Sequence, residues 1–112
     1  MIEDELREAI STFAKLTHHE KTIVLARFAF ELTVAARDTY VPGSTQIRYP
    51  ERLRALNEIQ HRVTSRIVDI LLQREWEGAD EYVLTAAFDM AEAAECADYV
   101  RHGYKRSIAV AS

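Results

Sequence analysis

The amino-acid sequence predicts an all-α protein, a single domain with an antiparallel four-helix bundle-like fold. Ala, Leu, Glu and Arg, all good helix formers, dominate the 112 residues, which include only three Gly and two Pro. Apolar residues recur every three or four positions in four segments, and no strand-length window alternates with a period of two. The length is close to the commonest size of one domain. We therefore expect residues 1–112 to form one helical domain, with residues 103–112 as a C-terminal tail.

The first helix is predicted over residues 3–16. Its apolar positions Ile2, Leu6, Ile10 and Phe13 are spaced by four, four and three residues, which places them on one face. Three acidic residues occupy the first turn, where the helix dipole favours negative charge.

The second helix is predicted over residues 17–40, where Thr17 and Glu20 have the spacing of a capping box. Apolar residues occupy two nearly opposite sides of this helix. One side holds Leu25, Phe28 and Leu32, and the other holds Ile23, Phe30 and Val34. A helix that is apolar on two sides lies at the centre of a bundle or at a subunit interface. We therefore expect Ile23, Phe30 and Val34 to form the interface of a homodimer.

The third helix is predicted over residues 50–74 and the fourth over residues 80–102. Pro50 suits the first helical position because proline has no N–H that needs a partner. Gly78 marks the break between these helices, and Asp80 has the residue type of an N-cap. Six arginines stand against three acidic residues over 48–74, whereas residues 75–98 contain eight acidic residues and no Lys or Arg. The third and fourth helices should therefore attract each other.

Composition also limits the functions worth considering. A formal charge of −4 gives no support to non-specific nucleic-acid binding. The single cysteine cannot form an internal disulfide. No apolar run approaches the roughly 18 residues of a membrane span, and the first residues lack a signal-peptide pattern. We therefore expect a cytoplasmic protein.

Glu58 and His61 have the E-x-x-H spacing that supplies metal ligands in di-iron helical bundles. Such a site needs two of these motifs and two further glutamates, and this chain has one motif. Helical geometry also turns both residues away from the apolar stripe of their helix. The adjacent His18 and His19 point about 100° apart, so they chelate poorly. A metal-binding or small-ligand bundle is therefore a weak alternative, and we expect no metal and no cofactor.

The basic third helix suggests a different alternative, a nucleic-acid-associated regulator. Its binding residues would be Arg48, Tyr49, Arg52, Arg54, Arg62 and Arg66. Helix-turn-helix proteins place a turn of about three or four residues before the recognition helix, whereas the loop here is about nine residues long. Three acidic residues are also interleaved with the arginines.

The outer face of the fourth helix carries two aromatic residues and two carboxylates, at Phe88, Glu92, Glu95 and Tyr99. Aromatic residues are enriched at protein interfaces, so this strip is a candidate surface for another protein. The alternative is that Phe88 and Tyr99 pack on the first helix or the tail. Arg54 and Arg62 lie farthest from the core stripe of the third helix, so they are further candidates for partner binding.

No motif for nucleophilic, phosphate-binding or metal-dependent catalysis is present. The sequence therefore predicts a small interaction or regulatory protein without catalytic activity, forming a homodimer and binding another protein.

Overall fold

The computed structural model describes residues 2–93, with side chains described for residues 4–89, and this part of the chain contains four helices and no strand. The helices are α1 (Ile2–Ala14), α2 (His18–Arg37), α3 (Pro50–Leu71) and α4 (Ala79–Ala93). The all-helical prediction is confirmed. The first three helices end two or three residues earlier than predicted, and the predicted continuation of the fourth to residue 102 lies outside the described residues.

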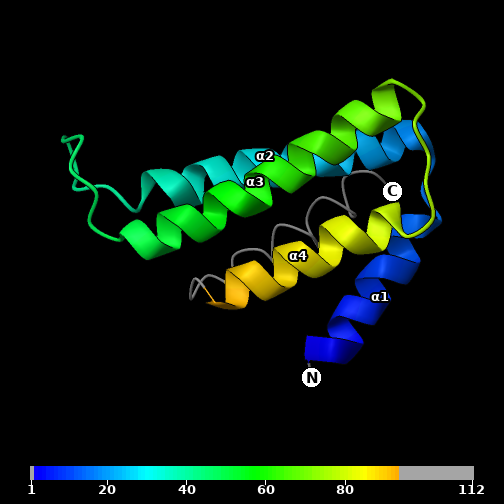
Figure 1. The fold of residues 1–112 in the computed structure, drawn as a ribbon, viewed down its shortest axis with the longest axis horizontal. Helices are drawn as coiled ribbons and strands as arrows, with labels where there is room; N and C mark the ends of the chain where they lie inside the picture. Colours follow the sequence, from blue (N-terminus) through cyan, green and yellow to red (C-terminus); the bar gives the residue numbers. More distant parts are fainter. Residues whose placement is uncertain (1, 94–112) are drawn as a thin grey trace.

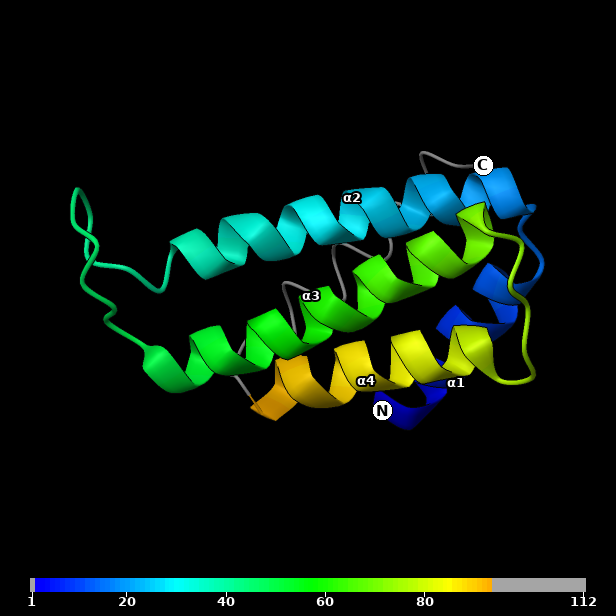
Figure 2. The same ribbon diagram turned by 45° about the horizontal axis from the view of Figure 1, so that its top comes forward.

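Helices α2, α3 and α4 lie side by side, and α1 lies obliquely to them (Figure 1). The chain reverses direction between α2 and α3 and again between α3 and α4, as Figures 1 and 2 both show. Helix α3 packs against both α2 and α4, and α1 packs against α4. No helix within the described residues is long and apolar enough to cross a membrane.

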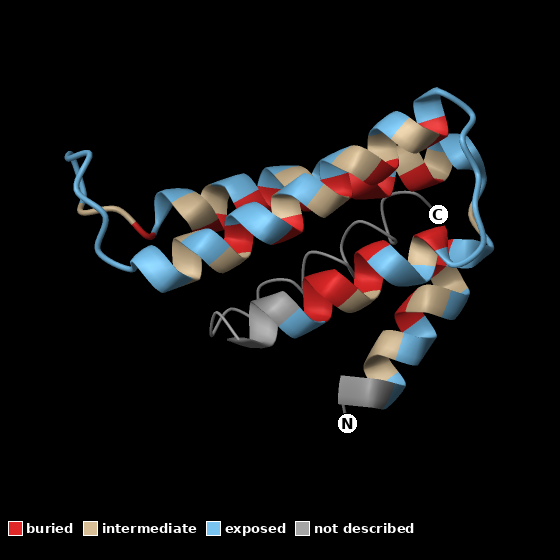
Figure 3. Ribbon diagram, in the orientation of Figure 1, coloured by how far each residue is buried: buried red, intermediate tan, exposed pale blue. Residues whose placement is uncertain are grey.

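One hydrophobic cluster joins all four helices. Its largest fully buried apolar residues include Phe13 of α1, Leu25 and Phe28 of α2, Ile59 of α3 and Phe88 of α4. Figure 3 shows that the buried residues gather on the sides of α2, α3 and α4 that face one another. Burying one such side chain stabilises the fold by about 1.5–3 kcal/mol before the entropy cost of ordering is subtracted. The apolar periodicity of the sequence thus identifies the facing sides.

The predicted capping box at the start of α2 is confirmed. The backbone N–H of Glu20 donates to the Thr17 hydroxyl at 3.1 Å, and the backbone N–H of Thr17 donates to the Glu20 carboxylate at 2.9 Å. These two bonds favour the charged carboxylate and lower the pKa of Glu20 below its ordinary value. The box fixes where the chain turns from α1 into α2.

Helix α2 ends at Arg37 because the following residues turn into an ordered loop. The Thr39 hydroxyl donates to the Ala36 carbonyl at 2.6 Å, and the fully buried Thr39 accepts on its own carbonyl from the N–H groups of Arg48 and Tyr49. Gly43 closes the tip with φ +72°, a left-handed value that glycine adopts without strain. The loop projects beyond the ends of α2 and α3 (Figure 1).

Helix α3 ends at Leu71 in a Schellman motif. The N–H of Arg74 donates to the Asp69 carbonyl at 2.7 Å, and that of Gln73 donates to the Ile70 carbonyl at 3.0 Å. Gln73 occupies the left-handed position, with φ 58°, that glycine normally takes. Without a glycine as the signal, the sequence places this helix end three residues too late.

Buried charges attach α4 to α2 and α3. Asp80 accepts from Lys21 of α2 at 2.6 Å and from Arg66 of α3 at 2.9 Å. Arg66 also donates to Glu75 at 3.1 Å, and Glu75 lies 3.2 Å from the His18 imidazole. Two sequence predictions are corrected here. Asp80 is an ion-pair partner inside α4 rather than its N-cap, and Arg66 is buried, with 2% of its side chain exposed.

Candidate functional site

An aromatic and charged cluster covers the outer face of α3 and α4. The Arg62 guanidinium lies over the Tyr82 ring, 4.7 Å from its centroid, and its Nε donates to Glu58 at 3.1 Å. Tyr82 also meets Trp76 edge to face, with ring centroids 5.5 Å apart. The indole N–H of Trp76 donates to Asp69 at 3.2 Å. Each aromatic ring is thus held by a polar partner or a second ring while 45% of the residue stays exposed.

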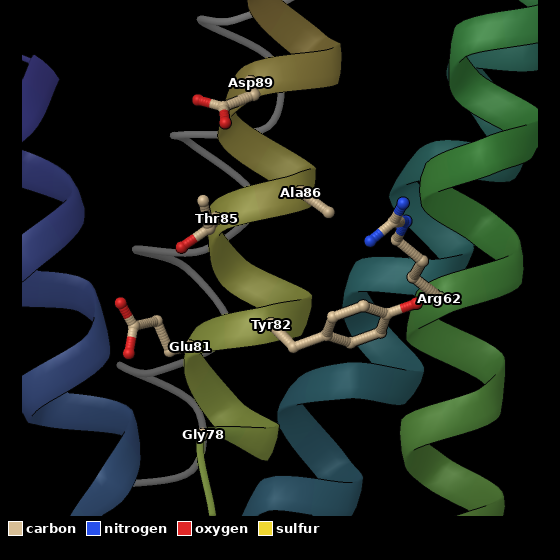
Figure 4. A pocket seen from close by; sticks show the side chains of 7 residues that line it. All are labelled: Arg62, Gly78, Glu81, Tyr82, Thr85, Ala86 and Asp89. Carbon is tan, nitrogen blue, oxygen red and sulfur yellow. The ribbon is translucent and has the colours of Figure 1, made fainter.

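A shallow pocket of about 410 Å³ lies on this face. Figure 4 shows Tyr82 and Ala86 on the side of α4 toward Arg62, and Glu81, Thr85 and Asp89 on its other side. The last three follow the i, i+4, i+8 spacing of one helix face. The pocket therefore combines an aromatic ring with two carboxylates.

These groups favour a cationic ligand. A Lys or Arg side chain is attracted to the face of an aromatic ring and forms charge-assisted hydrogen bonds with carboxylates. Arg62 already makes such a contact with the Tyr82 ring within the molecule, so a cationic side chain of a partner would share this ring with Arg62 or displace it. The pocket is open, so it suits a side chain from another protein better than an enclosed small molecule.

Of the predicted partner-binding strip on the fourth helix, the structure describes the side chain of Phe88. The expectation of an outward Phe88 is corrected, because only 2% of this residue is exposed. Helix α4 lies between α3 and α1, so it has two buried sides instead of one (Figure 4). The side chain of Glu92 and residues Glu95 and Tyr99 lie outside the described part.

The arginines predicted as a nucleic-acid surface are divided among three places. Arg48 and Arg52 lie over the Tyr49 ring near the projecting loop, at 4.8 and 4.6 Å from its centroid. Arg54 is exposed and pairs weakly with Glu51, at 3.4 Å. Arg62 lies over Tyr82 of α4, and Arg66 is buried and paired with Asp80. The six residues therefore do not form one continuous basic surface.

The predicted metal ligands are likewise separated. Glu58 and His61 are both exposed, and Glu58 pairs with Arg62. His18 contacts Glu75, and His19 is exposed beside it at the start of α2. Residues 4–89 hold no group of three His, Cys, Asp or Glu side chains arranged for a metal ion.

The second apolar side of α2 lies on the molecular surface. Ile23 is 37% exposed, Phe30 is 56% exposed, and Val34 is half-buried. The Arg27 guanidinium lies over the Phe30 ring, 5.3 Å from its centroid. Leu25, Phe28 and Leu32 fill the core from the other side of the same helix. The described helices thus leave a large aromatic residue in contact with solvent.

Sequence reasoning missed Trp76 and Tyr82. Both belong to the segment EWEGADEY, in which two aromatic and four acidic residues flank Gly78 and Ala79. This mixture of residue types could have identified the site. Periodicity could not, because the segment is divided between a loop and the first turn of α4.

Comparison of the chain with protein-family models, with curated proteins and with solved structures finds no match.

Proposed function

We propose that this protein is a small helical interaction or regulatory protein without catalytic activity, and that it forms a homodimer through the outer side of α2. The supporting observation is the exposure of Ile23 and Phe30 on a helix whose opposite side fills the core. Covering aromatic and aliphatic side chains on an exposed helix face removes apolar surface from water, which favours association with a partner. The proposal also includes the cytoplasmic location and the antiparallel four-helix bundle as the fold of the whole single-domain chain.

Light scattering of purified protein tests the dimer. Phe30→Glu places a charge at the centre of the exposed side of α2 and should convert the dimer to a monomer. Leu72→Glu is the matched control, because Leu72 is similarly exposed, at 54%, but follows α3. A wild-type protein that stays monomeric at high concentration contradicts the proposal.

A second surface, on α3 and α4, is proposed to bind a basic segment of another protein. Tyr82 provides a ring on the side of α4 toward α3, and Glu81 and Asp89 provide carboxylates on its other side, so a basic segment would contact them with separate Lys or Arg side chains. Trp76 is the only tryptophan and lies against Tyr82, so its fluorescence reports on this surface.

Titration with a lysine-rich peptide should change the Trp76 fluorescence. Glu81→Gln combined with Asp89→Asn should weaken the response, whereas Glu51→Gln, which removes an exposed carboxylate at the start of α3, should leave it unchanged. An unchanged response in the double variant would show that the pocket does not bind the cation.

The nucleic-acid and metal alternatives receive less support from this geometry. The arginines of the proposed nucleic-acid surface are dispersed, and Arg66 forms ion pairs with Asp80 and Glu75. Salt-dependent binding of DNA or RNA in a gel assay would revive it, since phosphate contacts are strongest at low salt. A rise in melting temperature with one metal ion of a panel would support the metal-binding alternative, because specific binding stabilises the folded state.

A further inference from the structure

Six residues on the outer side of α2 follow the spacing of a coiled-coil seam. They are Glu20, Ile23, Arg27, Phe30, Val34 and Arg37, separated by three, four, three, four and three residues. We call them the outer stripe. Each is exposed or half-buried in the structure. Alternation of three and four residues keeps side chains along one line of a helix that packs on another helix.

The outer stripe has the same spacing in both directions along the chain. A second copy of α2 running antiparallel therefore brings every position of the stripe opposite another position of the stripe. In this register Ile23 faces Val34 of the second copy, Arg27 faces Phe30, and Glu20 faces Arg37. Twofold symmetry makes each of these contacts occur twice.

The three kinds of contact are complementary in their chemistry. Ile23 and Val34 pair two aliphatic side chains. Arg27 already lies over Phe30 within one copy, and the register places it beside the same ring of the second copy, where a cation is again favoured. Glu20 and Arg37 pair opposite charges at the ends of the stripe, which sets the register more than it adds stability.

Other arrangements of two α2 helices lose this complementarity. A parallel pair in register places Arg27 against Arg27 and Arg37 against Arg37, and like charges repel. An antiparallel pair shifted by seven residues places Arg27 against Arg37. The opposite shift places Ile23 against Arg27 and moves Val34 beyond the stripe. Charge complementarity thus selects one arrangement.

We propose that two copies of this chain pair antiparallel along the outer stripe, with the twofold axis midway between Arg27 and Phe30. This inference rests on the proposed homodimer and specifies its geometry. It identifies the second copy as the group that covers Phe30, which is 56% exposed in the single chain.

Disulfide trapping tests the register. The native Cys96 is first replaced by Cys96→Ser, and the full chain is prepared with Ile23→Cys, with Val34→Cys or with Ile47→Cys. Ile23 and Val34 tolerate the change because cysteine is small and apolar. Ile47, in the α2–α3 loop and 42% exposed, is the control position. Pairs of chains carrying tags of different mass are mixed, oxidised mildly and separated without reductant.

The expected product is a disulfide between an Ile23→Cys chain and a Val34→Cys chain, at least tenfold more abundant than any product of the Ile47→Cys chain. Two Ile23→Cys chains should not cross-link, because eleven residues separate positions 23 and 34 along a helix. The two positions 23 then lie about 16 Å apart, beyond the roughly 7 Å that a disulfide spans.

The other outcomes are distinguishable when light scattering is measured on the same samples. A dimer in which Ile23→Cys links to Ile23→Cys overturns the antiparallel register. A dimer that neither cysteine pair traps overturns the outer stripe as the interface, while homodimerisation stands. A monomer overturns the proposed function and this inference together.

Discussion

Replacing Asp80 with alanine is expected to destabilise the protein by about 3–5 kcal/mol, the cost of breaking a buried ion pair from one side. The substitution removes the carboxylate that Lys21 and Arg66 share. Only 8% of the Lys21 side chain and 2% of that of Arg66 are exposed, so water cannot replace the lost partner. The Nη1 group of Arg66 already lacks a hydrogen-bond acceptor among the described residues, so losing Asp80 would leave more of this buried guanidinium without acceptors.

Glu75→Gln is the matched control, because Glu75 contacts the same guanidinium from a side chain that is 45% exposed. An exposed pair contributes about 0–1 kcal/mol, so the two carboxylates of Arg66 should differ several-fold in their effect. Urea unfolding followed by circular dichroism gives both values, and Asp80→Asn supplies a milder variant if Asp80→Ala does not fold. A loss below about 1 kcal/mol at Asp80, or an equal loss at Glu75, would refute the argument from burial.

Three further predictions concern the ends of helices. Gln73→Gly should raise the free energy of unfolding by about 0.5–1 kcal/mol, since φ 58° strains a residue with a Cβ; thermal unfolding that shows a loss would contradict this. Gly78→Ala should lower it by about 1–2 kcal/mol at φ +80°, although nothing lies within 4 Å of the added methyl group. Glu20→Gln should destabilise the protein above the ordinary pKa of 4.5, because the folded-state pKa is lowered. The difference in stability between variant and wild type should vanish as the pH falls through that lowered pKa. Urea unfolding midpoints measured at several pH values test this, and a difference that persists in acid would contradict it.

Local chemistry made the starts of α2 and α3 predictable. Thr17 caps α2 and Pro50 occupies the first turn of α3, both as the sequence indicates. Helix ends were less predictable because they depend on the loops that follow. Thr39 ends α2 by bonding to the far end of its loop, and Gln73 ends α3 without glycine. Neither arrangement has a signal in the local composition.

The site residues were harder to predict because a helical wheel assumes a single neighbour. Phe88 and Arg66 both looked outward on that assumption, yet α4 has helices on two sides and Arg66 faces a carboxylate 14 residues away in sequence. Tyr82 packs under the guanidinium of Arg62 and remains 45% exposed, a contact that apolar periodicity does not indicate. The exposed side of α2 was the easier case, since two apolar sides were visible in the sequence itself.

The Lys21–Asp80 ion pair has a consequence for how the molecule opens. It joins residues 59 positions apart, and Asp80 lies in the first turns of α4. Detaching α4 would separate Asp80 from both cations at once and expose buried apolar residues such as Phe88, so opening at α4 should cost a large share of the free energy of complete unfolding. Backbone amides of α4 that are hydrogen-bonded within the helix should then exchange with deuterium no faster than those at the centre of α3, despite α4 being the last helix described.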